Sequence, residues 1–194
     1  MSAEEGLRER KRRRTSEALV AAGLKLFLAH GYEETTIDEI VEAAEIGRRT
    51  FFAYFNSKEE LLQAAQDTGF GDALRTAFAN VDPKQVTPYA AVRVELPRLV
   101  SRFETKESIA IDRLIRSSES LRARKQATFA QMEQRLFESL AEVWHERKVT
   151  RGVAMMAIGV LRLAMDTWHE ENARHPLAGY VRNGFRTLEA GLPR

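Results

Sequence analysis

Residues 35 to 61 decide the fold, and they read TTIDEIVEAAEIGRRTFFAYFNSKEEL. Twice in this stretch a hydroxyl residue is followed three positions later by a glutamate, at Thr36 with Glu39 and at Ser57 with Glu60. In such a capping box the hydroxyl accepts a hydrogen bond from one unpaired amide at a helix start, and the carboxylate accepts one from another. The spacing therefore predicts that one helix begins directly after Thr36 and another directly after Ser57.

A third, short helix is expected between these two starts. The segment Glu45-Ile46-Gly47 predicts a tight turn, and its glycine can cap the helix that Arg48 opens and Asn56 ends. Two short helices joined by a tight turn, the second carrying adjacent arginines, are typical of a DNA-binding helix-turn-helix. The reason is that a major groove admits one helix, and arginine side chains can bind the edges of guanine there.

The two faces of this short helix are expected to differ. We predict that Phe52 and Phe55 pack inward with Ile46, because aromatic residues at helical spacing usually belong to a core. Phe51 stays open between the edge of the core and a contact with a thymine methyl group. The residues left toward solvent or a ligand are Arg48, Arg49, Thr50, Ala53 and Tyr54. The alternative for the two arginines is an ordinary exposed charged face.

Several separated motifs, in this order, resemble the N-terminal domain of the TetR family of transcriptional regulators. The resemblance covers roughly residues 11 to 71, about a third of the chain. It implies a three-helix DNA-binding domain followed by an all-helical domain that dimerises and usually binds a small inducer. The motifs are Phe27-Leu-Ala-His-Gly31-Tyr32, Thr35-Thr36-Ile37, Ala44, the stretch from Gly47 to Phe55, and Ser57-Lys58-Glu59-Glu60-Leu61.

The same resemblance implies roles for individual residues. Thr36 would cap its helix and contact a phosphate, Tyr54 would hydrogen-bond a phosphate, and Lys58 with the start of its helix would clamp the DNA backbone. The full set implied to bind DNA is Thr36, Gly47, Arg48, Arg49, Thr50, Phe51, Tyr54 and Lys58. Two residues depart from the family pattern: Gly47 stands where serine is common, and Phe52 where tyrosine is frequent. Each departure removes a hydroxyl that would contact DNA.

A run of cations precedes this region. Residues 1 to 10 are expected to form a flexible basic arm, and the cations assigned to DNA are Arg10, Lys11, Arg12, Arg13 and Arg14. Such an arm can reach phosphates or a minor groove beside the main contact. The alternative is a solvated, frayed terminus, since charge runs at chain ends are often no more than that.

Composition excludes several classes of protein. There is no cysteine, so disulfides, thiolate metal sites and cysteine nucleophiles are ruled out. The four histidines lack metal-ligand spacing, and no catalytic triad, phosphate loop or HExxH motif occurs. We therefore expect no enzyme, no cofactor and no metal. The strongly apolar stretch from Val153 to Leu161 is too short to span a bilayer and no secretory signal is apparent, which favours the cytoplasm and no membrane contact.

Helical periodicity continues through the rest of the chain, so an all-α fold is predicted. The domains expected are the arm at 1–10, the helix-turn-helix domain at 11–71, and a ligand-binding and dimerisation domain at 72–194. Pro97 falls inside a helical stretch and predicts a break or kink there. The helices expected are 12–30, 37–44, 48–55, 58–80, 88–103, 106–115, 118–147, 150–173 and 175–190.

The resemblance also implies a homodimer that acts as a repressor. The partners expected are a second copy of the chain and a double-stranded DNA operator of inverted-repeat symmetry. A small, apolar inducer is expected to release the repressor from this operator. Residues that fit a dimer interface in the last two helices are Val160, Leu163, Leu177, Val181, Phe185 and Leu188; an intramolecular core is the alternative. Residues that fit an apolar ligand site are Phe103, Phe129, Met132, Phe137, Trp144, Met165 and Trp168, with ordinary core packing as the alternative. The other function considered is a helical interaction protein whose basic arm binds an acidic partner or a membrane surface.

Overall fold

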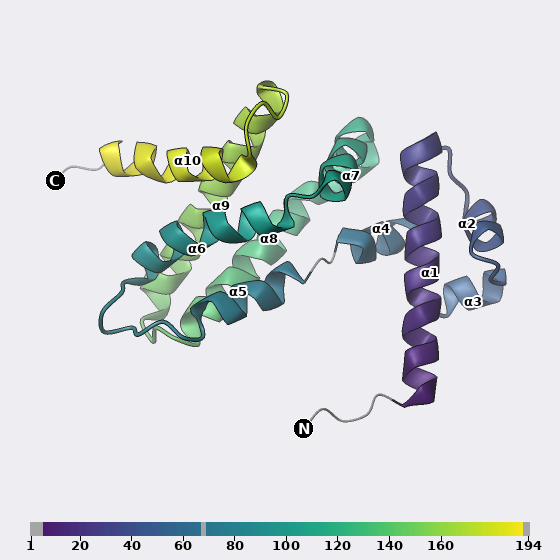
Figure 1. The fold of residues 1–194 in the computed structure, drawn as a ribbon, viewed down its shortest axis with the longest axis horizontal. Coiled ribbons are helices and arrows are strands. Elements are labelled where there is room, and N and C mark those ends of the chain that lie inside the picture. Colours follow the sequence, from purple (N-terminus) through teal and green to yellow (C-terminus); the bar gives the residue numbers. More distant parts are fainter. Residues whose placement is uncertain (1–5, 67–68, 192–194) are drawn as a thin grey trace. The chain divides into compact units, whose positions relative to one another are not determined.

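The computed structural model describes residues 6–66 and 69–191, without the side chains of residue 66 and of residues 123–126. All regular structure in these ranges is helical, which confirms the predicted all-α class (Figure 1). The helices are α1 (Leu7–His30), α2 (Ile37–Ala43), α3 (Arg48–Phe52), α4 (Lys58–Gln66), α5 (Phe70–Phe78), α6 (Pro88–Phe103), α7 (Lys106–Ser117), α8 (Glu119–Ala141), α9 (Arg147–Glu170) and α10 (Leu177–Gly191).

The helices form two compact units. The first contains residues 1–68 together with 107–123, and the second contains 69–106 and 124–194. The predicted domain at 72–194 is therefore not one continuous unit, because α7 and the start of α8 belong with the helix-turn-helix. The cause is an apolar face formed by Ile111, Leu114 and Leu121, which is buried in the core of the first unit.

In the first unit, α2 and α3 lie on one side of α1 and α4 lies on the other (Figure 1). The core joins Leu19 and Phe27 of α1 to Ile40 of α2 and Leu61 of α4, all of them fully buried. Helices α1 and α4 approach closely because Gly23 has no side chain: a Cβ atom there would lie 2.5 Å from Cδ2 of Leu61. This packing fixes the position of α4 on α1.

The two capping boxes form to different extents. At α2, the Thr36 hydroxyl accepts a hydrogen bond from the Glu39 amide at 3.2 Å, and the Glu39 carboxylate accepts one from the Thr36 amide at 2.7 Å. This box is confirmed. At α4, Ser57 accepts from the Glu60 amide at 3.3 Å, but the Glu60 carboxylate accepts from the backbone and side-chain amides of Asn56. Only the hydroxyl half of the second box is as predicted.

The single helix predicted at 58–80 is two helices, α4 and α5. Helix α5 begins directly after Gly69, whose φ of 75° is in the left-handed region that interrupts a helix and favours glycine. By contrast, α6 continues through Pro97, where we predicted a break or kink. Pro97 is buried, as are Leu96, Leu99 and Val100 in the same helix, so this part of α6 belongs to the core without a break.

The second unit packs α10 against α6 and α9 around a large apolar core. The start of α10 is held by Glu104, whose two carboxylate oxygens accept from the Leu177 amide at 3.1 and 3.0 Å.

None of the helices that the structure describes has both the length and the apolar character of a membrane-spanning segment.

Candidate nucleic-acid interface

The predicted recognition helix is shorter than expected. Helix α3 ends at Phe52, and the chain continues to Phe55 as turns in which the amides of Tyr54 and Phe55 bond to the carbonyl of Phe51. The turn before it places Glu45 at a φ of 54°, an unusual conformation for a residue with a side chain. The helix-turn-helix of the prediction is present, with five residues in its second helix.

The aromatic residues of α3 are arranged differently from the prediction. Phe51 is fully buried and Phe55 nearly so, whereas Phe52 is 47% exposed. Positions 51 and 55 share one face of a helical turn because they are four residues apart, and this face meets the core. The prediction that Phe52 anchors the core is therefore wrong. Phe51 has no exposed surface with which to contact a thymine methyl group.

The two arginines of α3 have different surroundings. Arg48 forms an ion pair with Asp38 of α2, and its guanidinium lies 5.9 Å from the ring centroid of Phe52. Arg49 is exposed, and the structure records no ion pair or hydrogen bond of its side chain to any described residue. Thr50 and Tyr54 are half-buried, and Tyr54 packs against the core of the first unit. Of these residues, Arg49 is the one whose charge is directed to solvent alone.

Two of the predicted phosphate contacts have other partners in the structure. The Nζ atom of Lys58 donates to the carbonyls of Tyr32 at 2.8 Å, Thr35 at 2.7 Å and Glu33 at 3.3 Å. It also lies 4.7 Å from the centroid of the Tyr32 ring. An ammonium group has three N–H donors, so the donors of Lys58 are occupied within the unit. Lys58 ties α4 to the turn between α1 and α2 and is not placed to clamp DNA.

The hydroxyl of Thr36 is likewise occupied, because it donates to the Glu39 carboxylate at 2.8 Å while accepting from the Glu39 amide. These bonds lower the pKa of the Glu39 carboxyl, first through the backbone amide of Thr36 and then through its hydroxyl. Thr36 therefore caps α2 as predicted, but its proton is used in the cap and not for a phosphate.

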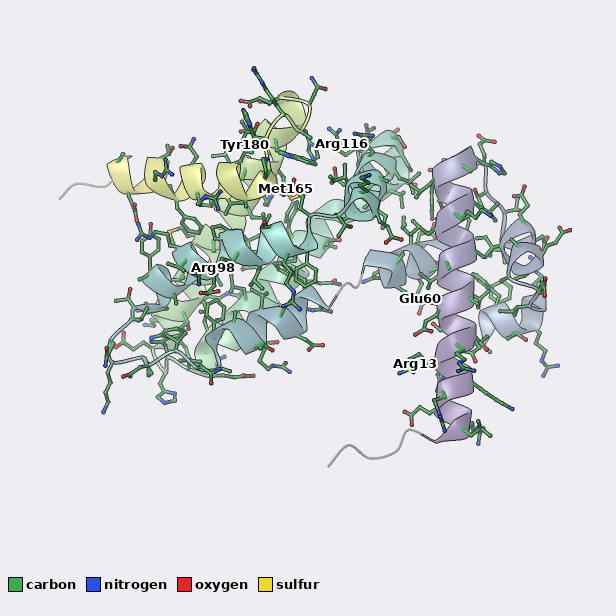
Figure 2. All side chains as sticks on the ribbon, viewed as in Figure 1. Arg13, Glu60, Arg98, Arg116, Met165 and Tyr180 are labelled. Atoms are coloured by element: carbon green, nitrogen blue, oxygen red, sulfur yellow. The ribbon has the colours of Figure 1, made fainter. Side chains whose placement is uncertain are left out.

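The basic run predicted as an arm lies in a regular helix. The five cations from Arg10 to Arg14 are all exposed in the N-terminal turns of α1, which extend beyond α2 and α3 (Figure 1). Figure 2 shows Arg13 projecting from this part of α1, and its Nε lies 3.5 Å from Glu17. Residues 7–10, which we predicted as part of a flexible arm, are therefore helical, while residues 1–5 of that arm lie outside the described residues.

One contact that the sequence does not predict links the turn between α1 and α2 to the residues at the start of α8. The Glu33 carboxylate accepts hydrogen bonds from the hydroxyls of Ser118 at 2.6 Å and Ser120 at 2.8 Å. These two bonds lower the pKa of Glu33. No local pattern in the sequence joins positions 85 residues apart, so only the folded unit reveals this contact.

The residues predicted at a dimer interface divide into two groups. Helices α9 and α10 cross so closely that a Cβ atom on Gly184 would lie 2.8 Å from Cγ1 of Val160. This intramolecular crossing uses part of the predicted surface. Val160, Val181 and Phe185 are buried in the core of the second unit, Leu177 is half-buried, and Leu163 and Leu188 are exposed. The prediction is wrong for the three buried residues.

The residues predicted at a ligand site also divide. Trp144 and Trp168 are buried, and each indole N–H is used within the unit: Trp144 donates to the carbonyl of Val86 at 3.0 Å and Trp168 to that of His175 at 2.9 Å. The first bond joins two loops, and the second attaches the loop before α10 to α9. Phe129 and Phe137 are buried, whereas Phe103, Met132 and Met165 are half-buried at the edge of the core.

Among the described residues there is no cluster of three or more histidine or acidic side chains that could hold a metal.

Comparison with known proteins agrees with this architecture. The family model described as bacterial regulatory proteins, tetR family, matches residues 19–65, which include the second half of α1, all of α2 and α3, and most of α4. The transcriptional regulator TcmR of Streptomyces glaucescens is 38% identical over 143 residues, which are 70% of this chain and 63% of TcmR. The chain belongs to the TetR family.

Solved structures with the TetR-family fold extend the likeness over nearly the whole chain. NalD, the secondary repressor of the MexAB-OprM efflux pump in Pseudomonas aeruginosa, has a TM-score of 0.64 at 17% identity, covering 94% of this chain and 98% of its own. FadR of Thermus thermophilus in complex with lauroyl-CoA has a TM-score of 0.57 at 24% identity, covering 92% and 96%. These likenesses show the fold. In sequence, the chain spans less than two thirds of TcmR and still smaller shares of the next two curated relatives.

Proposed function

We propose that this TetR-family chain is a repressor that binds an inverted-repeat DNA operator as a homodimer and is released by a small apolar inducer. The observation that carries the DNA-binding part is the placement of Arg49. Its exposed guanidinium stands on a short helix that follows a tight turn and whose opposite face, at Phe51, is buried in the core. A guanidinium in this position suits the acceptor atoms of guanine in the major groove.

A dimer is proposed because α3 is short. One helix of five residues contacts only a few base pairs, so useful specificity requires two copies on paired half-sites. Support for its location comes from α9, where Met155 is 54% and Leu163 59% exposed. Gly152 and Gly159 lie on the same helical face and allow a partner helix to approach closely. Leu188 of α10, 39% exposed, is a further large apolar side chain that the unit leaves uncovered.

The inducer is proposed to be apolar and to bind in the second unit. Phe103, Met132 and Met165 are half-buried beside the core, and side chains of this kind adapt to apolar ligands. FadR of Thermus thermophilus, which has the same fold, binds lauroyl-CoA. A ligand that prefers one conformation of the dimer would shift its population and so change the affinity for DNA.

The DNA-binding proposal is tested by selecting bound sequences from a random pool of duplexes. The affinity for the selected duplex is then measured against a scrambled one over a series of salt concentrations. Arg49→Gln should lose preference at one base pair of each half-site, whereas Lys25→Gln, a control that also removes an exposed cation, should keep it. Equal binding of selected and scrambled DNA would overturn the proposal. If anionic lipid vesicles then bound more tightly than DNA, the basic turns of α1 would indicate a surface-binding protein instead.

The dimer is tested by sedimentation. Leu163→Glu should convert the protein to monomers and abolish tight operator binding, because it places a charge in the proposed apolar interface. Leu28→Glu, an equally drastic change at an exposed leucine of α1, should leave the oligomeric state unaltered. A monomeric wild-type protein, or a dimeric Leu163→Glu variant, would contradict this interface.

A further inference from the structure

Asp38 and Arg48 form a bridge across the helix-turn-helix. The Nη1 atom of Arg48 lies 2.5 Å from Oδ1 and 2.7 Å from Oδ2 of Asp38. The same guanidinium lies 5.9 Å from the centroid of the Phe52 ring. Arg48 is thus held on one side by a carboxylate of α2 and on another by an aromatic ring of its own helix, while its neighbour Arg49 has no recorded partner within the described residues.

Stability does not account for this arrangement. Both side chains are largely exposed, 59% for Arg48 and 68% for Asp38, and exposed ion pairs contribute only about 0 to 1 kcal/mol. The carboxylate is moreover unfavourable near a duplex, which carries roughly one negative charge per 1.7 Å of its length. Because Asp38 lies beside Arg48, on the face proposed to meet DNA, its carboxylate has an electrostatic cost in binding every sequence. Its pairing with Arg48 is what distinguishes Asp38 from the other exposed acids of α2.

We propose that Asp38 is a specificity-determining positioning residue for DNA recognition. By holding Arg48, it stops one of two adjacent arginines from binding whichever phosphate is nearest, and it leaves Arg49 to contact the base edge. Specificity is a difference between affinities, so a group that weakens binding to wrong sequences raises discrimination even where it adds nothing to the correct contact. This inference rests on the proposed DNA-binding function and adds to it the residue that separates the roles of the two arginines.

The first experiment compares Asp38→Asn with Glu42→Gln. Both variants remove one exposed negative charge from α2, but the structure records no side-chain bond of Glu42 to a described residue. Both should bind scrambled DNA more tightly through charge alone. Only Asp38→Asn should also lower the ratio of selected to scrambled affinity, by about two- to fivefold, the scale of an exposed ion pair. Asp38→Glu keeps the charge and should retain most of the wild-type ratio.

The second experiment is a double-mutant cycle on the same ratio. With Arg48→Gln in place, Asp38→Asn should change discrimination no more than Glu42→Gln does, because the arginine that it would release is gone. Arg49→Gln should lower the ratio whether or not Asp38 is present. Thermal unfolding checks that each variant is folded.

The outcomes separate the two proposals. A wild-type protein that does not discriminate between the selected and scrambled duplexes overturns the proposed function, and this inference with it. A discriminating wild-type protein whose Asp38→Asn and Glu42→Gln variants have the same ratio overturns the inference alone. The inference alone is also overturned if Asp38→Asn lowers the ratio of selected to scrambled affinity as much in the Arg48→Gln background as in the wild-type protein.

Discussion

Residues 35–61 and the pair of helices α9 and α10 teach different lessons about how a sequence specifies structure. In the first region, polar side chains fix the backbone at particular positions: Thr36 and Glu39 start α2, and Lys58 binds three carbonyls of the preceding turn. In the second region, apolar surface covers several faces, and close packing between the two helices decides which part is buried. Hydrogen bonds define positions residue by residue, whereas apolar burial defines only a surface.

The largest effect that tests this contrast is expected at two neighbouring phenylalanines. Phe51→Ala should lower the free energy of unfolding by about 3 to 5 kcal/mol, because it leaves a cavity in a fully buried site. Phe52→Ala, at a half-exposed site, should cost less than about 1 kcal/mol. Urea unfolding followed by circular dichroism measures both. Similar losses for the two variants would contradict the assignment of Phe51 to the buried face of α3 and of Phe52 to its exposed side.

Lys58 should show the next largest effect. Lys58→Met keeps much of the side-chain volume but removes the donors to three carbonyls, and it should cost about 1 to 2 kcal/mol of stability. Lys25→Met, an exposed lysine of α1, serves as the control and should be near neutral. If Lys58→Met instead leaves the melting temperature unchanged and weakens binding to all DNA equally, with a shallower salt dependence, Lys58 binds phosphate after all.

The capping carboxylate of α2 should make stability depend on pH in the acid range. The folded state lowers the pKa of Glu39 below its ordinary value of 4.5, so its contribution is complete above that pH and is lost as the pH falls through the lower folded pKa. Glu39→Gln should reduce the dependence of the urea midpoint on pH below 4.5. Glu34→Gln, an exposed neighbour, should leave that dependence unchanged. An unaltered slope in Glu39→Gln would mean that the charge of the Glu39 carboxylate contributes nothing to the cap in solution.

The smallest effect is expected at the turn between α2 and α3. Glu45 has a φ of 54°, a conformation that costs side-chain-bearing residues roughly 1 to 2 kcal/mol and that glycine adopts freely. Glu45→Gly should therefore stabilise the first unit by about 0.5 to 1 kcal/mol after the entropy of glycine in the unfolded chain is counted. Glu42→Gly, within helix α2, should destabilise it by about 1 kcal/mol. A loss of stability in Glu45→Gly would indicate that the glutamate side chain makes a favourable contact in the turn.

Local sequence patterns predicted the helical class, the order of the helices and the cap of α2, because these depend on residues a few positions apart. The patterns failed where distant packing decides. Phe52 was assigned to the core since spacing alone does not show which side of a five-residue helix faces α1. Apolar side chains such as Val160, Val181 and Phe185 suit a dimer interface as well as a core. The close crossing of α9 and α10 at Gly184 and the burial of these side chains show that they belong to an intramolecular core.

The sequence predicted where the candidate site lies, but it did not predict which of its polar groups already have partners. Arg49 and the basic turns of α1 are exposed as expected. The donors of Lys58 and Thr36, and one face of Arg48, are taken up by partners in the same unit. Charge and position on a helix do not reveal such partners, because Asp38 is ten residues from Arg48, and Lys58 is more than twenty residues from the carbonyls that it binds.

The discontinuous make-up of the first unit has a consequence for protein engineering. Ile111, Leu114 and Leu121 complete its core, and Ser118 and Ser120 bind Glu33, so a chimera that transplants only residues 1–68 onto a foreign sensor would carry an uncovered apolar face. A graft that also carries residues 107–123 keeps that face covered. Supplying this segment as a separate peptide to the shortened fragment should restore its folding, in the manner of a split reporter.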